Sequence, residues 1–128
     1  MPKVVLQLLA GEYAVCRLPP TEPVPAWAGS TVFSSITRTA DELSILCPAR
    51  QVPPGIKAEL GWRLLQFQGP FAFGATGILN SVTGPLAQAG ISLLAVATFD
   101  TDYLLVPAAR LDEAGRVLQT AGHTVRRG

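Results

Sequence analysis

The stretch GPFAFGATGILNSVTGPLAQAGIS, Gly69 to Ser92, decides the fold of this 128-residue chain. After its glycine-rich start, apolar residues recur at the spacing of a helix, at Ile78, Val82 and Leu86. Gly90 is suited to end that helix, because glycine accepts the left-handed conformation of helix C-termini. Proline removes a helical hydrogen bond, so Pro85 predicts a kink, or a helix that restarts with Pro85 in its first turn.

The residues on both sides of this helix predict strands and a second helix. Ile91 to Thr98 is a continuous apolar run, which predicts a strand buried on both faces or nearly so. The other expected elements are a strand at Trp62 to Gln68, a strand at Tyr103 to Val106, a helix at Arg110 to Ala121 and a short strand at His123 to Arg127. The order β-α-β-β-α-β predicts the ferredoxin-like α+β fold, with both helices on one face of a sheet.

The first half of the chain predicts strands and little helix. Lys3 to Leu9 and Tyr13 to Leu18 are expected to form one hairpin, and Thr31 to Arg38 and Leu43 to Cys47 a second. The proline-rich segment between them cannot be a central strand, because proline lacks the amide donor. Pro-Pro-Gly near Pro53 to Gly55 marks a boundary, so we expect a reduced unit over residues 1–60 and a complete unit over residues 61–128.

Composition excludes several classes of function. Apolar residues make up 48% of the chain against 15% charged, so a packed core is expected. The net charge of +1 is spread without a basic stripe, which argues against nucleic-acid and membrane partners. Apolar runs are too short to cross a bilayer. Cys16 and Cys47 fall inside expected strands and fit small buried residues better than a disulfide or metal pair, and a cytoplasmic protein is the simpler interpretation.

Several strings of this sequence resemble the ACT-domain family of ligand-sensing modules. The similarity rests on LPP followed by PAWA, on FSSITRTADELSILCP (Phe33 to Pro48), on GILNSVTGPLAQAGIS and on TFDTDYLLVP (Thr98 to Pro107). More narrowly, the chain is similar to stand-alone two-domain ACT proteins, which also resemble the arginine sensors of animals. The resemblance implies two ACT-like units side by side, forming one continuous antiparallel sheet with the helices on one face. It also implies a small amino acid bound at the seam between them.

The resemblance further implies a set of ligand-binding positions. The loop that opens the first helix and the next two strands supply them: Thr76, Gly77, Ile78, Thr98, Phe99 and Asp102. Chemistry supports the assignment, because amides at a helix N-terminus attract a carboxylate and Asp102 could pair with an ammonium group. Ordinary helix entry explains Gly77 equally, and a solvated turn acid explains Asp102.

Neighbouring residues leave the ligand open. Asp100 fits a turn residue that bonds its own backbone, and Phe99 is either a pocket wall or, preferably, a core residue. The loop from Gly69 to Gly77 has no acidic residue, so the resemblance to arginine sensors does not extend to arginine as the ligand.

No constellation of catalytic residues stands out. His123 is the single histidine, and no nucleophile-base set, phosphate-binding loop or metal spacing is present. We therefore expect a regulatory sensor rather than an enzyme, without cofactor or metal, that binds a small molecule such as an amino acid. The alternative is a structural or protein-interaction module with a degenerate site. A homodimer is expected, because open sheets leave edges that pairing covers, and a regulated protein partner fits a sensor.

Overall fold

The computed structural model describes residues 2–69 and 77–128. The chain divides into two compact units. We call Met1–Ala10 together with Arg63–Gly128 the split unit, and Gly11–Trp62 the inserted unit. The chain therefore leaves the split unit after its first strand and returns to it within a later one.

The split unit contains the expected β-α-β-β-α-β order. Its elements are β5 (Lys57–Phe67), α1 (Ile78–Gln88), β6 (Leu94–Ala97), β7 (Asp102–Pro107), α2 (Leu111–Thr120) and β8 (Thr124–Arg126). The prediction of a ferredoxin-like α+β unit is thus confirmed. A further strand, β1 (Val5–Leu8), lies between β5 and β8, so the pairing order is β6-β7-β5-β1-β8.

The predicted hairpin between the first two strands is wrong. β1 pairs antiparallel with β5, where Leu6 lies opposite Phe67, and parallel with β8, where Leu6 lies opposite Val125. Consequently the pairing is not antiparallel throughout. It also places residues 1–10 with the C-terminal elements, whereas the expected division assigned them to the N-terminal unit. A short polar turn at Ala10-Gly11-Glu12 resembles a hairpin loop, and only long-range pairing shows that it connects two units.

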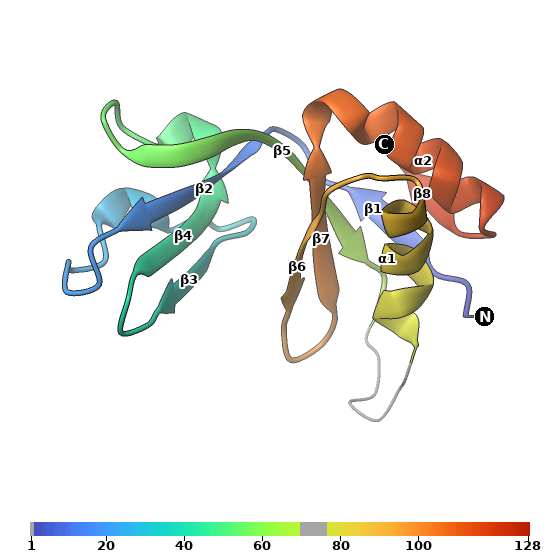
Figure 1. Ribbon diagram of the computed structural model, residues 1–128, viewed down its shortest axis with the longest axis horizontal. Coiled ribbons are helices and arrows are strands. Elements are labelled where there is room, and N and C mark those ends of the chain that lie inside the picture. The colour runs from blue at the N-terminus through green and yellow to red at the C-terminus, as the bar shows by residue number, and fades with distance from the viewer. Residues whose placement is uncertain (1, 70–76) are drawn as a thin grey trace. The chain divides into compact units, whose positions relative to one another are not determined.

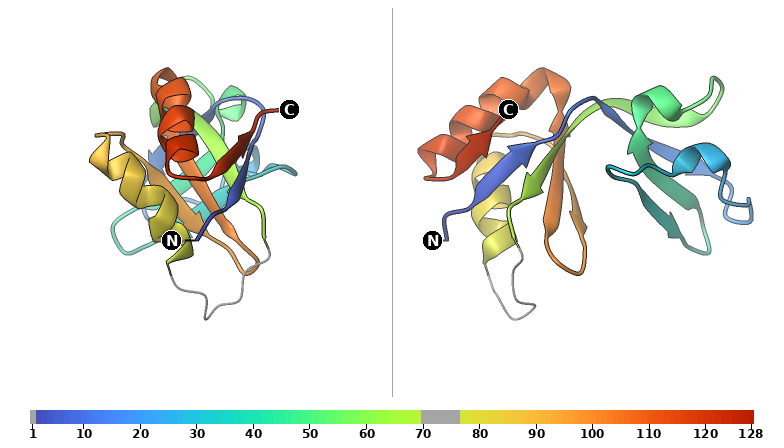
Figure 2. Two further views of the ribbon diagram at one scale, coloured as in Figure 1. Left: turned by 90° about the vertical axis from the view of Figure 1, so that its right-hand side faces the viewer. Right: turned by 180° about the vertical axis from the view of Figure 1, so that it is seen from behind.

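Both helices of the split unit cover the same face of its sheet, as Figures 1 and 2 show. Their apolar sides meet side chains of β1, β5 and β7 in one core. The core comprises Val4, Leu6, Leu65, Phe67, Val82, Leu86, Ile91, Leu104, Val106, Leu111, Ala114 and Leu118. At about 25 cal/mol per Å² of apolar surface, this burial is the main force that holds the helices on the sheet.

Helix α1 continues through Pro85 without restarting. A proline at this position cannot donate to the carbonyl of Ser81, four residues earlier. His123 supplies the missing donor, because its Nε2 lies 2.7 Å from that carbonyl oxygen. Its Nδ1 accepts the amide of Val4 at 3.1 Å, which fixes the neutral tautomer with hydrogen on Nε2. The buried imidazole therefore links α1, the segment before β1 and the segment before β8.

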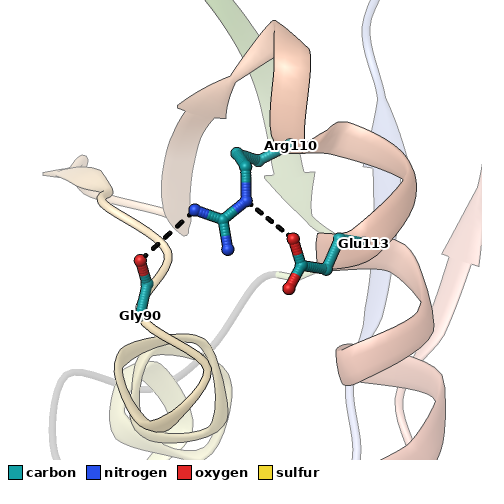
Figure 3. A network of polar contacts seen from close by, with 3 residues as sticks. All are labelled: Gly90, Arg110 and Glu113. Atoms are coloured by element: carbon teal, nitrogen blue, oxygen red, sulfur yellow. Dashed lines mark hydrogen bonds and ion pairs between the residues drawn. The ribbon is translucent and has the colours of Figure 1, made fainter.

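The start of α2 is tied to the turn after α1. Arg110 Nε donates to Glu113 Oε1 at 2.7 Å, and its NH1 donates to the carbonyl of Gly90 at 3.4 Å (Figure 3). The hydrogen bond from Arg110 lowers the pKa of Glu113. Both side chains are partly exposed, so the pair orients the helix start more than it stabilises the fold.

The residues of strand β6 are less buried than the sequence predicted. It is shorter than the predicted strand, and half-buried residues alternate with exposed ones along Leu94–Ala97. The expectation of burial on both faces is therefore wrong. The reason is that the two helices cover only one face of the sheet, so alternate residues of β6 point toward the helix layer and away from it.

The inserted unit is a sheet with the pairing order β3-β4-β2-β5. Its strands are β2 (Tyr13–Leu18), β3 (Ser35–Arg38), β4 (Leu43–Pro48) and the first part of β5. The predicted hairpin of β3 and β4 is confirmed, with Ile36 opposite Ile45. Two short 3-10 helices, η1 (Ala26–Ala28) and η2 (Ala49–Gln51), take the place of long helices. Gln51 joins them by donating to the carbonyls of Trp27 and Gly29, both at 2.8 Å.

β5 belongs to both pairing networks and starts earlier than expected. Its first residues pair with β2, where Arg17 lies opposite Lys57, and its last residues pair with β1. Gly61 has φ +82 at a point where the register with β2 shifts, as in a bulge. A bulge bends a strand without ending it, so the Pro-Pro-Gly turn precedes one long strand.

Both cysteines lie in the core of the inserted unit. They occupy diagonal positions on β2 and β4, since Ala14 pairs with Cys47 and Cys16 with Ile45. Burial, and after it the adjacent Cys16 sulfur, raise the pKa of Cys47 to about 11. Burial also raises the pKa of Cys16. The thiols therefore stay protonated at neutral pH and act as small core residues.

The bond between His123 and Ser81 predicts an energetic coupling with Pro85. His123→Ala leaves two buried backbone groups unpaired and should lower the free energy of unfolding by about 2–4 kcal/mol. Pro85→Ala restores an amide that can donate to Ser81. In a double-mutant cycle followed by urea unfolding, His123→Ala should therefore cost about 1 kcal/mol less in the Pro85→Ala background. Strict additivity of the two changes would contradict this account.

The buried thiols predict a loss of stability in alkali. An unfolded cysteine ionises near 9.0, whereas folded Cys47 ionises near 11. As the pH rises through this interval the unfolded state loses the proton first, so the free energy of unfolding falls. Urea titrations at pH 8 and pH 10.5 measure the fall, and Cys47→Ala should reduce it. An equal alkaline loss in Cys47→Ala would show that other groups cause it.

Candidate functional site

A cavity of about 310 Å³ lies at one end of the split unit. It is formed by the end of β5 with the residues after it and by the turn between β6 and β7. The lining residues are Gln66, Phe67, Gln68, Gly69, Asp100 and Thr101. The N-terminus of α1 is at the same end of the unit (Figure 1). This is the end at which the sequence placed the ligand-binding loop.

The turn between β6 and β7 is held closed by its own threonines. The amide of Thr98 donates to the carbonyl of Thr101 at 2.8 Å, and the Thr98 hydroxyl donates to the same carbonyl at 2.9 Å. That hydroxyl also accepts the amide of Thr101 at 3.3 Å. The side chain of Thr98, a predicted ligand contact, is therefore used to shape the turn.

The cavity floor depends on a close approach at Gly69. The hydroxyl of Thr101 donates to the carbonyl of Phe67 at 2.9 Å, which draws the turn onto the end of β5. A Cβ at position 69 would lie 3.0 Å from Thr101 Oγ1 and 3.2 Å from the carbonyl oxygen of Asp100. Only glycine fits this contact without displacing its neighbours. Glycine here is thus required by packing between two segments far apart in sequence.

The start of α1 offers backbone donors. Gly77 precedes the helix with φ +78, and its carbonyl accepts the amide of Ser81 at 2.9 Å. Within the part of the chain that the structure describes, no side chain caps the helix at this point. The amide of Ile78 belongs to the first turn, whose donors have no partner within a helix, and the helix dipole favours an anion there. Thr76, the preceding predicted contact, lies outside the described residues.

The two remaining predicted contacts differ in placement. Asp102 is half-buried at the first position of β7, opposite Ala97, and follows directly on the cavity residue Thr101. Phe99 at the tip of the turn is 78% exposed, so the preference for a core residue is wrong. A two-residue turn tip extends beyond the sheet, which no local apolar pattern reveals.

Sequence reasoning missed four polar residues of the cavity. Gln66 and Gln68 follow the alternation of β5, and the Gln66 amide donates to the Tyr103 hydroxyl at 3.2 Å. Asp100 was interpreted as a turn residue alone, and Thr101 was not singled out. Two glutamines at i and i+2, on either side of Phe67, were the available signal, since alternate residues share a face.

The cavity thus combines amide, hydroxyl and carboxylate groups. Such a set can hold a small polar molecule by hydrogen bonds but contains no nucleophile paired with a base. The single histidine is buried beside Ser81 and Val4, where its bonds are structural. Among residues 2–69 and 77–128, no cluster of three or more metal-ligating side chains occurs. Within these same residues, no helix has the length and apolar character needed to cross a membrane.

Comparison with solved structures shows the same fold elsewhere. An Agrobacterium tumefaciens protein is 44% identical over 100% of this chain and 96% of its own, with a TM-score of 0.96. The ligand-free regulatory subunit of aspartate kinase from Thermus thermophilus is 11% identical over 87% of this chain and 91% of its own, with a TM-score of 0.60. The second likeness concerns the fold alone.

Sequence comparison gives a relative named as a sensor. The mouse (Mus musculus) cytosolic arginine sensor for mTORC1 subunit 1 is 32% identical over 102 residues, which are 78% of this chain and 30% of the mouse protein. The human (Homo sapiens) protein of the same name is 39% identical over 59 residues, which are 45% of this chain and 18% of its own. The chain therefore spans no more than about a third of these relatives.

Sequence profiles of known families match both parts of the chain. One profile, for an N-terminal domain, matches residues 11–55, which lie within the inserted unit. The profile of the ACT domain matches residues 57–120, from the start of β5 to the end of α2. Together with the β-α-β-β-α-β order and the similarity to regulatory ACT proteins, this match shows that the chain belongs to the ACT-domain family.

Proposed function

We propose that this protein is a regulatory module that binds a small amino acid or a similar zwitterion at the end of the split unit. The observation that carries the proposal is the polar cavity between β5 and the β6–β7 turn, at the same end as the start of α1. Membership of a family with sensor and regulatory relatives supports a sensing role for it.

A zwitterion has one negative and one positive group, and the proposed site offers amide donors for the first and carboxylates for the second. Its carboxylate would accept hydrogen bonds from the amides of Gly77 and Ile78, where the helix dipole is favourable. Its ammonium group would lie near the carboxylate of Asp102 or of Asp100. Charge-assisted hydrogen bonds of this kind are each worth about 1.5–3 kcal/mol when shielded from water. Thr98 would contribute through the turn it closes, and Thr76 and Phe99 remain proposed contacts.

Specificity within this class comes from the cavity itself. Gln66 and Gln68 present amides, which bond neutral polar groups, and Asp100 is the one carboxylate among the described lining residues, where it would be used by the ammonium group. The name of the mouse relative therefore does not fix arginine as the ligand here. We propose a small polar or apolar side chain for the bound amino acid.

The wider role follows from the same proposal. A module of this kind would act without catalysis in the cytoplasm and pass its bound state to a regulated protein partner through a homodimer. A second candidate is an assembly module of the same fold that binds no ligand. The observation in its favour is that the Thr98 hydroxyl is already bonded within the turn.

A thermal-shift screen against the standard amino acids tests ligand binding. A ligand at one hundred times its dissociation constant adds about 2.7 kcal/mol to the free energy of unfolding, which raises the melting temperature by several degrees. Asp102→Ala and Asp100→Ala should each reduce the shift, because they remove the partner of the ammonium group. Asp41→Ala, in the exposed turn between β3 and β4, is the matched control and should keep it.

Two results would contradict the sensor proposal. One is the absence of any shift across the screen at millimolar concentrations. The other is a shift that both aspartate variants leave unchanged, which would place the ligand elsewhere. Either result would favour the assembly module.

A further inference from the structure

Two buried polar residues of the split unit, Ser81 and His123, bond to each other. Ser81 is 1% exposed and His123 is 4% exposed. The Nε2 atom of His123 lies 2.7 Å from the carbonyl oxygen of Ser81. Its Nδ1 accepts the amide of Val4, so the ring carries its hydrogen on Nε2 and donates it to Ser81. Burying a polar group is costly unless it is hydrogen-bonded, and this bond compensates the burial of both partners.

Ser81 is also bonded to the two residues that open α1. Its amide donates to the carbonyl of Gly77 at 2.9 Å, and its hydroxyl donates to the carbonyl of Ile78 at 2.6 Å. Together these bonds close the first turn of the helix. Ser81 is therefore held from one side by His123, and it holds the start of α1 on the other.

The first turn of α1 carries the donors of the proposed site, the amides of Gly77 and Ile78. An amide donor binds a ligand best when its direction is fixed beforehand, because ordering it on binding costs affinity. Helix α1 cannot supply all of this order itself, since Pro85 has no amide to donate to the Ser81 carbonyl. The donor that replaces it comes from outside the helix, on the segment before β8.

We propose that His123 is a positioning residue of the ligand site, which acts through Ser81 on the amides at the start of α1. This inference rests on the proposed function, and it adds a residue that does not line the cavity. It also identifies which bond of the ring serves the site. That bond is the donation to Ser81, whereas the acceptance from Val4 holds the ring in place.

Two substitutions of His123 separate its two bonds. His123→Gln places an amide nitrogen as far from Cα as Nε2 is, so it can still donate to Ser81. His123→Asn places an amide oxygen as far from Cα as Nδ1 is, so it can still accept the amide of Val4. The glutamine variant thus keeps the bond that the proposal requires, and the asparagine variant keeps the other.

Amide hydrogen exchange of the ligand-free protein, resolved by NMR, is the first measurement. The amide of Ser81 should exchange about tenfold faster in His123→Asn than in the unaltered protein, and within about threefold of it in His123→Gln. Pro85→Ala gives α1 its own donor to the Ser81 carbonyl. In the Pro85→Ala background, His123→Asn should therefore change the exchange of this amide little.

Val106→Ala is the matched control for a general loss of stability. Val106 is fully buried in the same core, and its truncation removes apolar contacts but none of the bonds to Ser81. Exchange of the Ser81 amide should accelerate less in this variant than in His123→Asn, when both are compared at equal loss of stability in urea.

Isothermal titration calorimetry is the second measurement, with glycine, L-alanine and L-serine as probes. The dissociation constant of a probe should rise about fivefold or more in His123→Asn, because its carboxylate must then order the amides that it binds. His123→Gln and Val106→Ala should retain the affinity. An unaltered protein that binds none of the probes counts against the proposed function, and amide exchange then decides the role of His123 alone.

Four results would overturn the inference. They are equal exchange of the Ser81 amide in the asparagine and glutamine variants, an acceleration no greater than that of Val106→Ala, no rescue by Pro85→Ala, and an unchanged affinity in His123→Asn. A further test needs no variant. Nitrogen-15 shifts of the ring in the unaltered protein should show the hydrogen on Nε2, and a hydrogen on Nδ1 alone would exclude the donation to Ser81.

Discussion

The imidazole of His123 is the contact on which the packing of the split unit depends. It donates to the carbonyl that Pro85 leaves without a partner and accepts the amide of Val4. One buried side chain thus completes a helix, fixes the N-terminal segment and positions the last strand. Removing it would leave polar backbone groups inside an apolar core, where their desolvation is costly. The packing of α1 on the sheet and the position of β1 within the sheet therefore depend on the same side chain.

The cavity depends on a second constraint, the contact between Gly69 and the β6–β7 turn. Thr101 holds that turn against Phe67, and the missing side chain at position 69 allows the approach. The polar groups of the turn are consequently held against the end of a strand, and a fixed support positions binding groups more precisely than a free loop does. A ligand bound there would contact two segments whose separation is fixed by packing.

Local patterns predicted the helices and strands of the split unit well, but they did not predict which strands pair with one another. Helical spacing from Ile78 onward and the apolar face of α2 gave both helices, because periodicity reports which side of an element is buried. The same patterns could not show that β1 joins β5 and β8, or that β6 stays open on one side. An apolar run is equally consistent with a central strand and an outer strand, and only pairing distinguishes them.

By itself the sequence determined the α+β class, the β-α-β-β-α-β order and the family resemblance, because these follow from residues close together in the chain. It also indicated the end of the unit at which we propose a ligand site. Only the tertiary structure decided that Thr98 serves the turn, that Phe99 is exposed, and that Gln66 and Asp100 share a cavity. The physical reason is that these properties depend on contacts between segments distant in sequence, and such contacts exist only once the sheet has formed.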